Sequence, residues 1–63
     1  MTNTMNSILS RVLSQEIAHQ ERWKKDDIAM GFSGTDRDEY IIEIKRFMES
    51  NKIPFNQDWY SRI

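Results

Sequence analysis

The chain is short and nearly neutral: its 63 residues include no cysteine, one histidine, nine basic and ten acidic side chains, which gives a formal net charge of -1. This length allows one domain at most, the lack of cysteine excludes disulfides, and a single histidine is unlike the ligand set of a structural zinc site. The balanced charge excludes the overall attraction expected of a dedicated nucleic-acid or membrane binder. The first residues carry no basic region and no continuous apolar run, so we expect a soluble, cytoplasmic protein without membrane contact.

The first predicted element is a long helix over about residues 5–30. Thr4 or Asn6 is its expected N-cap, because a short polar side chain there accepts a bond from a free backbone N–H group. Gly31 is the expected C-terminal stop, with the glycine in the left-handed conformation and Phe32 folded back on the last turn. The apolar side chains that follow the spacing of one helix face are Met5, Ile8, Leu9, Val12 and Leu13, with Trp23 resuming the series further along.

Polar side chains interrupt this apolar face. Glu16, His19 and Gln20 lie on it, and Glu16 with His19 forms the E-x-x-H pair that supplies metal ligands in di-iron bundles. A di-iron site also needs further carboxylates and usually a second histidine, so we expect no metal or cofactor. We interpret the three side chains as a polar contact that fixes register and partner choice. Ile17 and Ile28 lie off the main apolar face, which favours an additional interaction surface.

A turn over Gly31–Gly34 precedes a second predicted helix over about residues 36–51. Thr35 or Asp36 is its expected N-cap, and the acidic residues of its first turn complement the helix dipole. Ile42 points away from its apolar face and is expected to be exposed. That face is formed by Tyr40, Ile41, Ile44, Phe47 and Met48.

The C-terminal residues predict a short third helix over about residues 57–62. Asn51 is expected to end the second helix, because the proline three residues further on cannot continue it. Asn56 is the expected N-cap of the third helix, with Phe55 and Tyr60 placed as a hydrophobic staple around it.

The two main helices are expected to differ in length. At about 1.5 Å per residue, the first spans roughly 36 to 39 Å and the second roughly 21 to 24 Å. The second helix, running antiparallel from the turn, therefore covers only the C-terminal half of the first. The residues left for the tail or another chain to cover are Ile8, Leu9, Val12 and Leu13. The tail residues available to cover them are Phe55, Trp59, Tyr60 and Ile63. We predict an all-α helical hairpin or mini-bundle that forms one domain and is oligomeric, with a dimer favoured.

The composition favours binding over catalysis. The chain has no nucleophile-elbow or P-loop pattern, and a domain of two or three helices rarely encloses a cleft that shifts pKa values, so we expect no enzymatic activity. The first hypothesis is a module that docks on a larger protein as a regulator, inhibitor or assembly factor, by analogy with compact inhibitors encoded by phages and mobile elements. The expected contact residues, for a protein partner or a second copy, are Ile8, Leu9, Val12, Leu13, Glu16, Ile17, His19, Gln20, Trp23, Ile42, Trp59 and Tyr60. The alternative is a nucleic-acid-binding oligomer that uses Arg11, Arg22, Lys24, Lys25 and Lys45.

Overall fold

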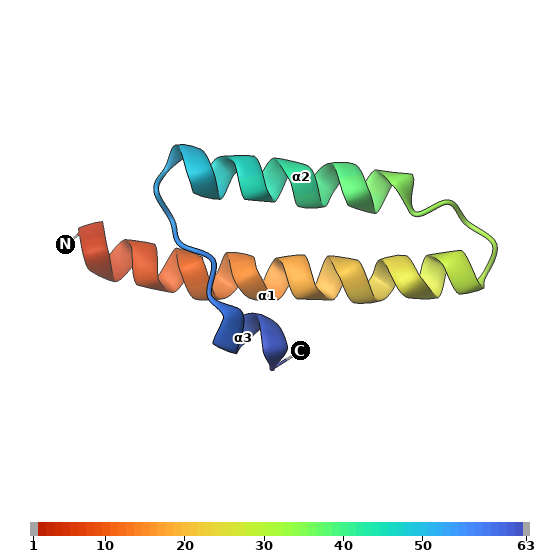
Figure 1. The fold of residues 1–63 in the computed structure, drawn as a ribbon, viewed down its shortest axis with the longest axis horizontal. Coiled ribbons are helices and arrows are strands. Elements are labelled where there is room, and N and C mark those ends of the chain that lie inside the picture. The colour runs from red at the N-terminus through yellow and green to blue at the C-terminus, as the bar shows by residue number, and fades with distance from the viewer. Residues whose placement is uncertain (1, 63) are drawn as a thin grey trace.

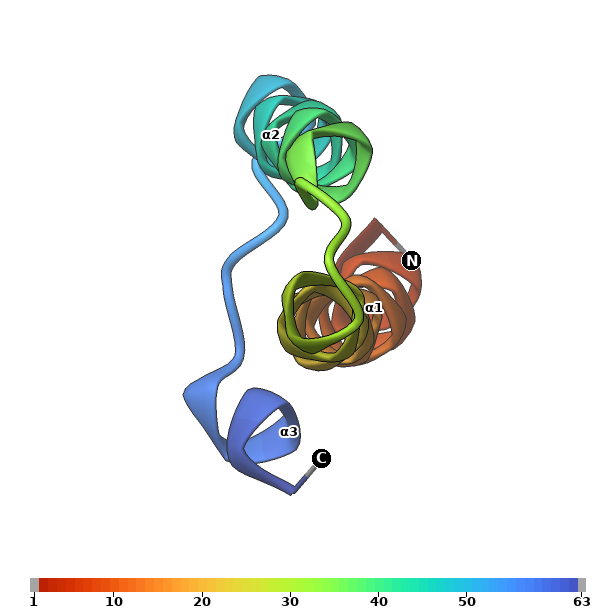
Figure 2. The same ribbon diagram turned by 90° about the vertical axis from the view of Figure 1, so that its right-hand side faces the viewer.

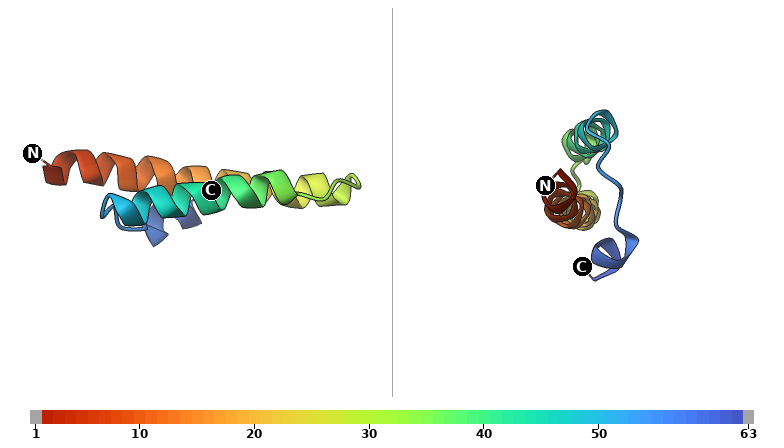
Figure 3. Two further views of the ribbon diagram at one scale, coloured as in Figure 1. Left: turned by 90° about the horizontal axis from the view of Figure 1, so that it is seen from above. Right: turned by 90° about the vertical axis from the view of Figure 1, so that its left-hand side faces the viewer.

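Three helices form the computed structural model of this protein, which describes residues 2–62 (Figure 1). α1 spans Thr2–Ala29, α2 spans Thr35–Ser50 and α3 spans Gln57–Ser61, and the described residues include no strand. α2 runs antiparallel beside α1, and α3 packs against the other side of α1 (Figure 2). The end-on view in Figure 3 also places α1 between the two other helices. The all-helical prediction, with a long, a shorter and a short helix in this order, is confirmed.

α1 ends in a Schellman motif at Gly31, which has a φ of 95°. The N–H of Gly31 donates to the carbonyl of Ile28 at 3.0 Å, and the N–H of Phe32 donates to the carbonyl of Asp27 at 2.8 Å. These bonds satisfy carbonyl groups that a helix end otherwise leaves without a partner. The predicted stop at Gly31 is confirmed. Phe32 is 64% exposed, however, so its side chain is not buried against the last turn as predicted.

The turn between α1 and α2 requires glycine at a second position. Gly34 is the N-cap of α2 in the left-handed conformation, with a φ of 74°, and it has no side chain to cap the helix; Oγ of Ser33 accepts a bond from the N–H of Thr35 at 3.3 Å instead. A β-carbon on Gly34 would lie 2.9 Å from Cγ of Lys24, because the turn packs closely on α1. The prediction that Thr35 or Asp36 caps α2 is therefore wrong, since both residues already lie within the helix.

The other predicted N-caps have opposite outcomes. α1 already begins at Thr2, so Thr4 and Asn6 lie inside the helix and are not its caps. Asn56 does cap α3: its side-chain oxygen accepts a hydrogen bond from the N–H of Trp59 at 3.2 Å. A capping side chain flanked by two aromatic residues, Phe55 and Tyr60, thus located the start of α3 correctly.

α2 also ends in a Schellman motif, although the left-handed residue here is not glycine. Asn51 is the C-cap, as predicted, and Lys52 follows with a φ of 55°. The N–H of Lys52 donates to the carbonyl of Glu49 at 3.2 Å, and the N–H of Ile53 donates to the carbonyl of Met48 at 2.8 Å. Ile53 and Met48 are both buried and supply the apolar contact that accompanies this motif. This contact turns the chain away from α2 and back toward α1.

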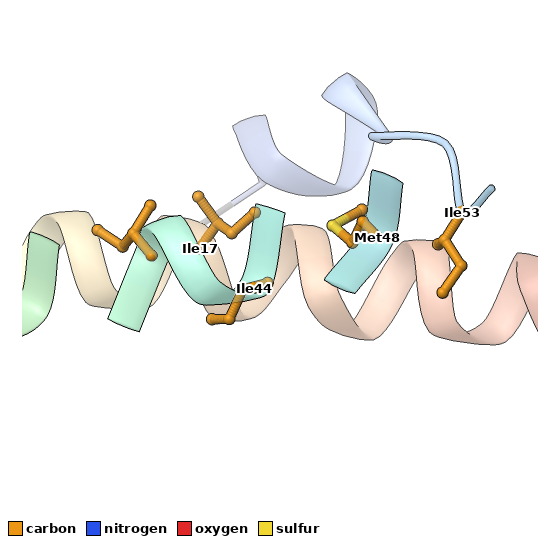
Figure 4. Packing of buried hydrophobic residues seen from close by; sticks show 5 residues of the cluster. Ile17, Ile44, Met48 and Ile53 are labelled. Atoms are coloured by element: carbon orange, nitrogen blue, oxygen red, sulfur yellow. The ribbon is translucent and has the colours of Figure 1, made fainter. Parts of the chain in front are cut away.

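The core lies between α1, α2 and the segment that leaves α2 (Figure 4). Its buried apolar residues are Ile17, Ile41, Ile44, Met48 and Ile53. The partly buried side chains packed against them are Leu9, Leu13 and Tyr60. Two residues of α1 that were expected to need a separate cover, Leu9 and Leu13, thus already border the core.

The buried face of α1 is displaced from the predicted one. Ile17 was placed off the apolar face, but it is 1% exposed and is the most buried apolar residue of the core. The reason is that α1 has neighbours on two sides, so its buried surface extends from the α2 side through Ile17 to Ala18. Ile28 is exposed, consistent with its position off the apolar face. On α2 the buried face is narrower than predicted, since Tyr40 and Phe47 are nearly half exposed.

Two buried serines of α1 hold the tail against the helix. The N–H of Asn56 donates to Oγ of Ser14 at 2.9 Å, and Oγ of Ser10 donates to the carbonyl of Pro54 at 2.5 Å. Ser14 is fully buried and Ser10 nearly so, which their small side chains permit where a backbone crosses closely. The tail thus packs on α1 of its own chain. This was one of the two predicted ways of covering α1, the other being a second chain.

Candidate interaction surface

One face of α1 is largely left uncovered by α2 and α3, and the guanidinium of Arg37 from α2 reaches over its Trp23 ring. At about 100° per residue its members fall within a sector of roughly 80°, on the side of the helix opposite the Ser10 and Ser14 contacts. We call this surface the outer face, and it comprises Met5, Ile8, Val12, Glu16, His19 and Trp23 of α1 together with Met30, which directly follows the last residue of α1. Its large apolar side chains are between 43% and 67% exposed. Ile8, Val12 and Trp23, all expected contact residues, are therefore available to a partner.

Polar and aromatic groups occupy the middle of the outer face. The ring of His19 stacks on Trp23 with their centroids 5.5 Å apart and their planes 15° apart. The guanidinium of Arg37, from α2, lies 5.4 Å from the centre of the Trp23 ring. These contacts hold Trp23 in place on the surface, and an aromatic side chain held in place loses little conformational entropy on binding.

Gln20 does not belong to this surface, because its side chain is buried in a polar network between α1 and α2. Its Nε2 donates to Oε1 of Glu16 at 3.1 Å, and its Oε1 accepts a bond from Nη1 of Arg37 at 3.1 Å. Arg37 also pairs with the carboxylate of Asp27 through its Nε. The network joins Glu16 on the outer face to α2, so Gln20 acts as an internal support rather than a contact residue.

Two aromatic residues of α2 extend the outer face, and the sequence pattern had assigned both to the core. Tyr40 and Phe47 are 44% and 49% exposed and lie on one flank of the buried face of α2. Ile42 lies on the other flank, where it lines a groove with Lys25 of α1. Tyr40 and Phe47 therefore border α1 on the side of the outer face.

A groove between α1 and α2, with a volume of about 580 Å³, forms a second surface, and it carries more charged side chains than the outer face does. Ile42 and Ile28 are both about half exposed there. Nζ of Lys24 pairs with a carboxylate oxygen of Asp38 at 2.6 Å beside them. The prediction that Ile42 is exposed is confirmed, and its surroundings carry charges of both signs.

Trp59 anchors α3 by stacking between cations. The guanidinium of Arg11 lies 5.2 Å from the ring centre and that of Arg62 lies 4.5 Å from it. Trp59 and Arg11 also line an open groove of about 610 Å³ with Lys52 and the backbone segment at Pro54. The half-buried Trp59 thus holds the chain's own tail in place.

Tyr60 is the second anchor of α3. Its hydroxyl donates a hydrogen bond to the carboxylate of Glu21, and its ring lies 5.2 Å from that of Phe55, as the predicted staple requires. The hydrogen bond to Glu21, followed by burial and by the negative charge of the same carboxylate, raises the pKa of Tyr60 above the ordinary tyrosine value of about 10.

The five cations of the nucleic-acid hypothesis do not form one continuous patch. Arg11 stacks on Trp59, whereas Arg22 lines a groove beside α3 that also contains Glu21 and Asp26. Lys24 pairs with a carboxylate and shares the groove between α1 and α2 with Lys25 and Lys45. Lys25 also lines the groove of Arg22, so Arg11 is the cation set apart from the other four. Carboxylates accompany the cations in both grooves, which weakens their attraction for a phosphate backbone.

The described residues contain no group of three or more potential metal ligands, so Glu16 and His19 stand as a pair without a third ligand. No helix in this part of the chain is long and apolar enough to cross a membrane. Comparison with known protein families, curated proteins and solved structures finds no match to this chain.

Proposed function

We propose that this chain is a small, non-enzymatic protein-interaction module that docks on a larger protein through the outer face of α1 and acts as a regulator, inhibitor or assembly factor. The observation that carries the proposal is the exposure of Val12 and Trp23 along a helix face that the chain itself leaves uncovered. Exposed apolar surface of this extent on a small domain usually forms an interface.

The arrangement of side chains supports the proposal. Tryptophan and tyrosine are enriched among the residues that dominate binding energy, and the chain exposes Trp23 on α1 and Tyr40 on α2. Arg37 and His19 contact Trp23 from two directions, so its ring is held before a partner arrives. Truncating a side chain at the centre of such an interface typically costs 2 kcal/mol or more, and we expect this of Trp23→Ala, or about a thirtyfold loss of affinity.

Affinity capture from the native host, followed by mass spectrometry, tests the proposal with two matched variants. Val12→Glu places a charge in the outer face, and Ile42→Glu places the same charge at a residue that is exposed to a similar extent on the other flank. We expect Val12→Glu to abolish retention of a specific partner and Ile42→Glu to preserve it. Equal retention by both variants at unchanged helicity contradicts the proposal.

The groove that brings Lys24, Lys25 and Lys45 together supports the second candidate function, binding of nucleic acid by an oligomer. Counterion release predicts that such binding weakens steeply with salt, with a slope of about 0.9 per phosphate neutralised. A filter-binding titration between low and physiological salt measures this slope. Steep salt dependence that Lys25→Glu reduces would favour this candidate over the protein-binding module.

A further inference from the structure

We propose that the outer face of α1 pairs with the outer face of a second copy of this chain, in antiparallel orientation, with Glu16 of each copy facing His19 of the other. This inference rests on the proposed function, because both require that the outer face binds a protein. It goes further by naming an occupant and an orientation.

The spacing of the residues along the outer face is that of a helix-pairing seam. Alternating steps of three and four residues are typical of two helices that pack along their length. The residues at these steps are six members of the outer face, Met5, Val12, Glu16, His19, Trp23 and Met30, together with the partly buried Leu9 and the exposed Asp26; Ile8 stands outside the series. The series runs the whole length of α1, whereas α2 covers only part of the helix (Figure 1).

One antiparallel register matches these residues to themselves. When Glu16 faces His19 of the second copy, Val12 faces Trp23 and Met5 faces Met30 of the second copy. Each of these contacts occurs twice, as a two-fold symmetric interface requires. Apolar residues then meet apolar residues on both sides of a central polar layer.

The layer formed by Leu9 and Asp26 limits the apolar area that this interface buries. Leu9 faces Asp26 of the second copy in the same register, so this layer adds no apolar contact. Leu9 is already partly buried against the core of its own chain, and exposed Asp26 lies at the margin of the seam.

Other arrangements bring like charges or unlike surfaces together. In a parallel pair Glu16 faces Glu16 and Asp26 faces Asp26. Shifting the antiparallel register by seven residues one way sets Glu16 against Val12, and shifting it the other way sets Glu16 against Asp26. A polar layer inside an apolar seam selects one register at some cost in stability, and here the charges select the antiparallel one.

The structure also prepares Glu16 and His19 for this contact. One oxygen of Glu16 accepts the bond from Gln20, which leaves its other oxygen for a group on a second copy. The face of the His19 ring stacks on Trp23, which fixes the orientation of the ring. The ring nitrogens therefore remain at the edge of the stack, where a carboxylate of the second copy can accept a hydrogen bond.

The available area corresponds to a small but specific interface. Stable interfaces bury about 800 Å² on each partner, roughly one sixth of the 4856 Å² that this chain exposes. A strip as long as the 28 residues of α1 and about 10 Å wide covers roughly 420 Å² in projection. The rings of Tyr40 and Phe47 extend this strip. With roughly half the area of a standard interface, the pairing should be weak and should dissociate on dilution, so the dimer should be concentration-dependent.

Sedimentation equilibrium from about 1 μM to about 300 μM tests the pairing. We expect the wild-type chain to shift from monomer to dimer over this range. Val12→Glu should lower the association constant at least tenfold, because the charge is placed twice opposite Trp23, and Ile42→Glu should leave the constant within about threefold. A chain that is monomeric throughout, or a dimer that Ile42→Glu disrupts and Val12→Glu does not, overturns the inference.

Exchange of the two polar residues tests the register. Glu16→His and His19→Glu each put like residues opposite one another and should weaken the dimer about tenfold, whereas the double variant restores both unlike pairs and should regain most of the affinity. Circular dichroism at each step checks that the helices persist. If the double variant is as weak as the two single changes combined, Glu16 does not face His19.

Cysteine pairing tests the orientation, since the chain has no cysteine of its own. When E16C and H19C chains are mixed and oxidised, the antiparallel register predicts a disulfide between the two different chains in large excess over either homodimer. Predominant linkage between two E16C chains would indicate a parallel pair and overturn the inference. These outcomes are separable from those of the proposed function: a monomeric chain that still loses its host partner on Val12→Glu contradicts only the self-pairing.

Discussion

Within residues 2–62, Lys52 is the non-glycine residue with a positive φ, a backbone conformation poorly suited to a side chain. It occupies the left-handed position of the Schellman motif after α2, with a φ of 55°, and it is exposed. This conformation costs a residue with a β-carbon roughly 1 to 2 kcal/mol. Glycine avoids that cost but loses roughly 0.5 to 1 kcal/mol of additional backbone entropy on folding. We therefore expect Lys52→Gly to stabilise the fold by about 0.5 to 1 kcal/mol.

Urea denaturation followed by circular dichroism measures this difference, and a thermal melt should rise by about 4 to 8 °C per kcal/mol for a domain of this size. Lys52→Ala is the matched control, because alanine removes the same charged group yet keeps the β-carbon, and its stability should stay close to that of the wild type. The reasoning is refuted if Lys52→Gly is no more stable than Lys52→Ala. That result would mean that the left-handed conformation of Lys52 does not lower the free energy of unfolding.

Three further predictions concern the core, the tail and pH. Ile17→Ala should destabilise the fold by about 2 to 4 kcal/mol in urea denaturation, because it leaves a cavity, while Ile8→Ala at an exposed position should cost under about 1 kcal/mol; similar losses for both would contradict the assignment of the core. Ser14→Ala should cost about 1 to 2 kcal/mol and speed hydrogen exchange across residues 56–61, because it removes the acceptor of the Asn56 N–H; unchanged exchange would show that the serine does not hold the tail. The raised pKa of Tyr60 means that its contribution to stability is present below about pH 10 and is lost as the pH rises through the folded-state pKa. An absorbance titration near 295 nm should show late ionisation in the wild type, and the fall in melting temperature above pH 10 should be smaller for Tyr60→Phe.

The sequence predicted best the features that depend on a few adjacent residues. The stop at Gly31 and the cap at Asn56 both follow from local backbone chemistry, and both are confirmed. The left-handed turn at Lys52 was missed because the burial of Ile53 against Met48 imposes it, and no local signal distinguishes this lysine from others.

The position of the buried face was harder to predict, because it depends on neighbours that are distant in the sequence. Counting apolar residues placed Ile17 outside the core, since the contribution of the tail to the environment of α1 was unknown. Ser10 and Ser14 were the available signal: two small polar residues four positions apart permit a backbone to cross a helix closely. The exposed Tyr40 and Phe47 have the same explanation, because one helix partner buries a narrower sector than these residues span.

The three helices lie side by side in a single layer, and the backbone measures 45 × 23 × 12 Å (Figure 3). A layer one helix thick has water on both of its broad surfaces, so little apolar area is removed from water when a single chain folds. An average domain of 63 residues has a heat capacity of unfolding of roughly 0.8 to 0.9 kcal/mol/K, at 12 to 15 cal/mol/K per residue, and the isolated chain should fall below this value. Its stability should consequently change little with temperature, and, on the proposed pairing with a second copy, calorimetry at rising concentration should show the heat capacity of unfolding increase.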